Sequence, residues 1–253
     1  MAVHIASLRH PVNLPILPYA GHYILRPLFE NLTTSYNSNE IPDALLVALA
    51  TATWAMSKYT LSEQKLIFLR MLLIHSLLMI FRSCLCFITS LPDTNSVCHE
   101  KRNVDHQYVI SETGSYTWSY ILNEKNIFEI VTTSPVMVFA PWTPTCGDMI
   151  YSGHTMLFVL FALVWHTYYS ENVYGLINYV KCAIWGYTLV CLLFIIGMHM
   201  HYTVDVALAL YFTVTVWSSY HRIAEDVKFG RRCHVVQWFV DKYFIYPVVE
   251  WFE

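Results

Sequence analysis

The chain has 253 residues, of which 56% are hydrophobic and only 13% are charged, with a net charge of −3. Such a composition excludes an ordinary soluble domain and favours a membrane protein with several spans. The charge gives no argument for a nucleic-acid partner, and no block of like charges indicates an interaction tail. Because the first twenty residues lack a continuous apolar core, we expect no cleavable signal peptide.

The amino-terminal residues 1–41 are mixed in character. Four prolines, at positions 11, 15, 18 and 27, interrupt any helical pattern there, so we predict an interfacial segment or loop that does not span. The sequon Asn31-Leu32-Thr33 lies within it. The first apolar run, 44–56, is short for a bilayer crossing.

Longer apolar runs follow. Residues 66–91 are long enough to span, although they contain Arg70, His75 and Arg82. Residues 92–150 are polar apart from a proline-interrupted piece at 127–142, which we expect to be re-entrant or interfacial. Clearer spans are predicted over 151–169, 176–197 and 203–220. The sequence therefore predicts an all-α, polytopic membrane helix bundle with five or six transmembrane helices.

Charge assigns the two sides of the membrane. The tail after residue 220 carries five lysines and arginines, whereas the longer 92–150 loop has three. The positive-inside rule therefore places the tail in the cytoplasm and the loop on the lumenal or outer side. Cys98 and Cys146 share that loop and could form a disulfide.

Three polar residues open apolar segments and indicate phosphoryl-transfer chemistry. His154 follows Ser152-Gly153, and His201 precedes Asp205 by four residues. On a helix, this spacing puts His201 and Asp205 on one face, where the carboxylate can fix the imidazole tautomer. With alternating span directions, His154 and His201 return to the same non-cytoplasmic side. A helix-stabilising or hydrogen-bonded core role for the pair is the alternative.

The segments around these residues resemble known signatures. Residues 146–155 (CGDMIYSGHT) and 199–206 (HMHYTVDV) are similar to two signature segments of the sphingomyelin synthase family, a branch of the lipid phosphate phosphatase superfamily. Residues 81–92 (FRSCLCFITSLP) resemble a third family segment, residues 41–43 a fourth, and residues 217–221 the aromatic end of the last span. One departure is Met200, where the family leads us to expect an acidic residue.

The resemblance implies an activity and roles. It implies transfer of a phosphocholine or phosphoethanolamine headgroup from phosphatidylcholine or phosphatidylethanolamine to ceramide, releasing diacylglycerol, with no metal or other cofactor. His201 would attack phosphorus, Asp205 would orient it, and His154 would move the protons. Golgi and plasma membrane are the implied locations, with the site lumenal or extracellular. The domains would be 1–41 non-spanning, 42–220 catalytic and 221–253 a cytoplasmic tail.

Further residues are candidates for substrate binding, each with a structural alternative. Ser152-Gly153 would leave amide groups facing an anion, or would form a turn and helix start. Arg82 would hold a lipid phosphate, or would extend to the membrane interface. Asp148 would bind a cationic headgroup or cap a helix. Tyr202 completes this set, and His199 could join His201 and Asp205 at a metal site.

Two other functions remain open from the sequence. A lipid phosphate phosphatase would use water in place of ceramide, but such enzymes usually carry an arginine six residues before the second histidine, where this chain has Ile195. A non-catalytic lipid-binding membrane protein would be expected to have lost one of the three site residues. All three are present.

Overall fold

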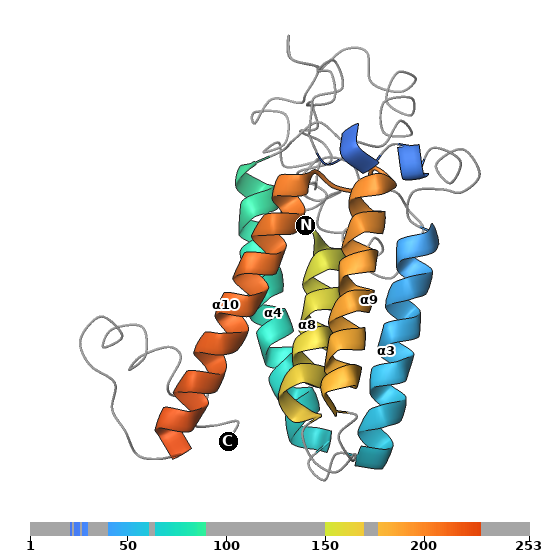
Figure 1. Cartoon of the computed structure of the whole chain (residues 1–253). Helices are drawn as coiled ribbons and strands as arrows, with labels where there is room; N and C mark the ends of the chain where they lie inside the picture. The colour runs from blue at the N-terminus through green and yellow to red at the C-terminus, as the bar shows by residue number, and fades with distance from the viewer. Residues whose placement is uncertain are drawn as a thin grey trace, which may run out of the picture. The chain divides into compact units, whose positions relative to one another are not determined.

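The computed structural model describes residues 21, 23–25, 27–29, 40–60, 64–89, 150–169 and 177–228. Its five labelled helices, coloured along the chain in Figure 1, are α3 (Glu40–Thr60), α4 (Gln64–Ile88), α8 (Gly153–Tyr168), α9 (Ile177–Gly197) and α10 (Thr203–Lys228). The described ranges contain no strand, so the expected all-α class is confirmed for them. Asp148, Cys98, Cys146 and the piece at 127–142 lie outside the described residues.

The helix bounds follow the apolar runs closely, with three differences. α3 begins at Glu40, four residues before the predicted run, because Pro42 is tolerated in a first turn whose N–H groups have no partner within the helix. α10 continues to Lys228, eight residues past the predicted end. Residues 21, 23–25 and 27–29 are helical, although the four prolines were expected to interrupt any helical pattern in residues 1–41.

The chain divides into two compact units, and the first contains residues 1–43, 80–153 and 192–209. Its core includes Tyr151, Ile195 and Met198, each at most 1% exposed. Phe29, which is 8% exposed, also belongs to this core, whereas Tyr23, Ile24 and Leu28 are exposed. The ring of Phe29 meets Phe194 edge to face at 5.0 Å, and a Cβ added at Gly197 would lie 2.6 Å from that ring. Position 197 therefore admits only a hydrogen beside Phe29.

The second unit contains residues 44–79, 154–191 and 210–253, and α8 is its centre. Nine of the sixteen α8 residues are buried. Trp165 donates to Thr53 of α3 (2.9 Å), and Tyr168 accepts from Arg70 of α4 (3.4 Å). Tyr168 also bonds to His221 of α10 (2.7 Å). These hydrogen bonds join α8 to α3, α4 and α10, so this nearly continuous apolar helix packs against its neighbours.

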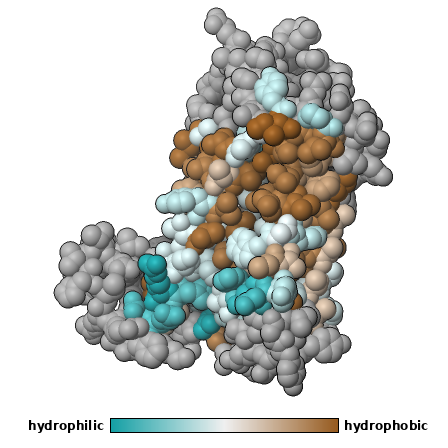
Figure 2. All heavy atoms as spheres, in the orientation of Figure 1, coloured by the Kyte–Doolittle hydropathy of each residue, from teal (hydrophilic) through white to brown (hydrophobic). Residues whose placement is uncertain are grey.

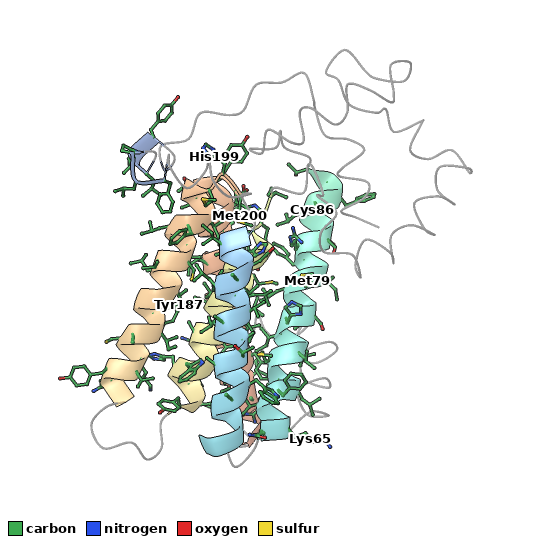
Figure 3. The ribbon with its side chains drawn as sticks, turned by 90° about the vertical axis from the view of Figure 1, so that its right-hand side faces the viewer. Lys65, Met79, Cys86, Tyr187, His199 and Met200 are labelled. Carbon is green, nitrogen blue, oxygen red and sulfur yellow. The ribbon has the colours of Figure 1, made fainter. Side chains whose placement is uncertain are left out.

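Two helices are long and apolar enough to cross a membrane, namely α4 over Gln64–Ile88 and α9 over Asn178–Gly197. Most of their side chains are not buried inside the protein. Large apolar side chains that are exposed include Ile80 and Ile88 on α4 and Leu189 on α9. Figure 2 shows one such apolar face, and Figure 3 labels Lys65 and Cys86 near the two ends of α4. The predicted five or six crossings stay a prediction.

Candidate active site

His201 lies in the short turn between α9 and α10, not on a helix. α10 begins two residues later at Thr203, so the expectation that His201 and Asp205 share one helical face is wrong. His201 is only 7% exposed. The turn, labelled by His199 and Met200 in Figure 3, therefore holds a buried imidazole in irregular backbone.

Asp205 fixes the start of α10 from the helix's first turn. Its Oδ2 accepts a hydrogen bond from the backbone N–H of Tyr202 (3.1 Å), and its own N–H donates to the Tyr202 carbonyl (3.1 Å). This is one half of a capping box, in which the third helical residue reaches back to the N-cap. The carboxylate is therefore hydrogen-bonded to the backbone N–H of the residue that directly follows His201.

The same carboxylate has a second, unused oxygen. Asp205 is fully buried, and its Oδ1 has no hydrogen-bond partner among the described residues. A buried carboxylate oxygen without a donor costs free energy, on the order of 1–3 kcal/mol for a neutral group and more for a charged one. Such an oxygen is a feature expected where a protonated group or a substrate hydrogen is to be received.

The first signature segment meets the second through the backbone. Ser152 is fully buried and precedes Gly153, the first residue of α8. The Ser152 N–H donates to the carbonyl of Asp205 (3.4 Å). The main chain therefore brings Ser152-Gly153 beside the start of α10, as the resemblance implied for two signatures of one site.

Arg82 lies against the start of α8. Its Nε donates to the carbonyl of Tyr151 (3.1 Å), and a Cβ placed on Gly153 would lie 3.6 Å from the guanidinium carbon Cζ. A cation beside a helix N-terminus is electrostatically unfavourable alone, because that end already carries partial positive charge. An anion between them would be attracted by both. Anion binding by Arg82 stays a prediction.

Tyr151 is a residue that the sequence reasoning missed. Its φ of 66° lies in the left-handed region, which non-glycine residues rarely adopt. The phenol ring is fully buried and meets Phe81 edge to face at 5.9 Å. Burial of this ring holds a backbone conformation that turns the Tyr151 carbonyl toward Arg82. An aromatic residue two positions before Gly153 gave no sequence signal for this role.

The remaining candidate residues, His154 and Tyr202, belong to different compact units. His154 follows Gly153 in α8 and belongs to the second unit, where it is half-buried. Tyr202 is 3% exposed in the first unit. Within the described ranges, no three histidine, cysteine or acidic side chains are arranged to hold a metal ion.

Comparison with known proteins finds a family model that matches part of the chain. Residues 145–222 match the family described as PAP2 superfamily, C-terminal, a range that includes His154, His201 and Asp205. These residues resemble a PAP2 superfamily C-terminal domain. The match begins just before the first signature segment and ends just after the aromatic residues of α10.

The names of similar proteins support the resemblance to the sphingomyelin synthase family. The chain is 32% identical over 112 residues to phosphatidylcholine:ceramide cholinephosphotransferase 1 of Caenorhabditis elegans, covering 43% of this chain and 22% of the relative. It is 27% identical over 151 residues to phosphatidylethanolamine:ceramide ethanolaminephosphotransferase of Trypanosoma brucei brucei, covering 59% and 38%. It is 25% identical over 207 residues to phosphatidylcholine:ceramide cholinephosphotransferase 2 of Mus musculus, covering 78% and 48%. The chain thus spans less than half the length of each.

Proposed function

We propose that this chain is a phosphosphingolipid synthase that moves phosphocholine or phosphoethanolamine from a glycerophospholipid to the primary hydroxyl of ceramide. The observation that carries the proposal is the α9–α10 turn. There, a buried histidine is followed at once by a residue whose N–H is bonded to a buried carboxylate with one unused oxygen. Relatives named as ceramide phosphotransferases support the substrate class.

The first half of the proposed reaction is a displacement at phosphorus. The neutral His201 imidazole attacks the phosphorus of the donor lipid, a P–N bond forms, and the P–O bond to diacylglycerol breaks. His154 gives its proton to the leaving oxygen. Asp205 stabilises the positive charge that develops on His201. Arg82 and the amides at the start of α8 hold the phosphate oxygens, whose charge they complement.

The second half restores the enzyme. His154 takes the proton of the ceramide hydroxyl, the ceramide oxygen attacks phosphorus, and the P–N bond to His201 breaks. A covalent intermediate lets two bulky lipids use the site in turn. Exclusion of water protects that intermediate from hydrolysis, which would make the enzyme a phosphatase. A site opening to the lumenal or outer leaflet would admit both lipids laterally.

The test uses membranes that contain the full chain, a fluorescent ceramide, and choline or ethanolamine phospholipids in parallel. We expect a new fluorescent phosphosphingolipid with at least one donor, and its loss in His201→Ala. His166→Ala is the matched control, because His166 is exposed on α8 and bonded to Trp185. Diacylglycerol or free phosphate without a phosphosphingolipid would disprove transfer, and activity surviving in His201→Ala would disprove the nucleophile.

A further inference from the structure

The end of α9 has a backbone geometry that normally calls for glycine. The N–H of Met200 donates to the carbonyl of Ile195 (3.1 Å), and the N–H of His199 donates to that of Ile196 (3.3 Å). This pair of bonds is the Schellman motif, and the residue at its left-handed position is His199, with φ of 57°. A histidine therefore occupies a position at which most chains place glycine.

The Schellman motif determines how the chain enters His201. The motif ends at Met200, whose N–H donates to the carbonyl of Ile195. The N-cap of α10 is Tyr202, whose N–H donates to the Asp205 carboxylate. Only His201 lies between these two constraints. The backbone direction at residue 199 therefore decides where the His201 imidazole is presented.

We infer that His199 is a positioning residue, which acts on His201 through its left-handed backbone and not through chemistry of its imidazole. The inference rests on the proposed role of His201 as nucleophile. Residues that tolerate the left-handed region, glycine and asparagine, should replace His199 with little loss. A β-branched residue resists that region and would rebuild the turn.

The experiment compares His199→Gly, His199→Asn and His199→Val in the ceramide assay, with kcat, KM and the pH–rate profile as readouts. We expect the Gly and Asn variants to keep the wild-type profile and nearly the wild-type kcat. The Val variant should lose about tenfold or more in kcat, because displacement of a reacting group is costly. His201→Gly is the matched control and should be inactive.

Two outcomes would overturn the inference. If the Gly and Asn variants lose as much as the Val variant, or change the pH–rate profile, the imidazole itself is used. If the Val variant has the kcat of the wild type, the backbone conformation at residue 199 does not control the position of His201.

Failure of the proposed function is recognised separately. In that case the wild type makes no phosphosphingolipid, and thermal unfolding in detergent replaces the activity readout. The Gly and Asn variants should then unfold near the wild-type temperature and the Val variant below it, and equal unfolding of all three would overturn the inference.

Discussion

Asp205 combines two roles that usually belong to different residues. One carboxylate oxygen caps α10 through Tyr202, and the other is buried without a partner among the described residues. A cap alone needs only one acceptor and no charge. The second oxygen is therefore the part of Asp205 that a purely structural role leaves unexplained.

Replacing the Asp205 carboxylate with an amide would separate these two roles. Asp205→Asn keeps an oxygen that can accept from the Tyr202 N–H, so we expect thermal unfolding in detergent to change little. Transfer should fall by a factor of about 10² or more, because the charge that stabilises the imidazolium is lost. Asp205→Ala removes the cap as well and should destabilise by about 1 kcal/mol. Near-normal transfer in the Asn variant would reduce Asp205 to a cap.

Sequence reasoning predicted His201 and Asp205 as site residues but assigned them the wrong local geometry. Four-residue spacing does indicate one helical face, yet helix starts depend on capping, and Tyr202 is not a typical N-cap residue. The usable signal was Asp205 itself, three residues after Tyr202, as the distal half of a capping box. The left-handed backbone at Tyr151 and His199 could not be foreseen, because tertiary packing imposes it against intrinsic preference.

At the level of elements, apolar runs predicted α8 and α9 closely, since a long run of apolar residues has to be helical to satisfy its backbone in lipid. They underestimated α10, because its last turns are amphipathic. Ile223 and Ala224 are buried there, while Arg222 and Glu225 are exposed. A span predicted from hydropathy ends where charged residues begin, but the helix continues as long as one of its faces remains apolar.

The contact between Phe29 and α9 gives a prediction about stability. The effect of Gly197→Ala should change sign when Phe29 is removed. Gly197→Ala gains about 1 kcal/mol of helix propensity, but its methyl would meet the Phe29 ring, and overpacking costs about 1–3 kcal/mol. We expect lower thermal stability in detergent. In a Phe29→Ala background the same change should raise stability.

Gly186 lies on the same helix and supplies the control for that series, because a Cβ added there would meet nothing within 4 Å. Gly186→Ala should leave stability unchanged or raise it in both backgrounds. Equal effects of Gly197→Ala with and without Phe29 would show that Phe29 does not pack on α9.

For the whole molecule, exposed apolar helices indicate a lipid environment. The two candidate spans leave most of their side chains unburied, and a soluble core helix would show the reverse. We expect the expressed chain to stay in the membrane pellet after an alkaline carbonate wash, and to be released by detergent. Release by carbonate alone would contradict the proposed integral membrane topology.

The hydrogen bond from Ser152 to the carbonyl of Asp205 has a consequence for biosynthesis. During translation, Ser152 leaves the ribosome before residue 205 has been made, so its main-chain partner is missing while α8 first folds. The start of α8 gains this partner only after α9 has folded back and α10 has begun. A nascent chain arrested before residue 205 should therefore be inactive, because this contact cannot form in it.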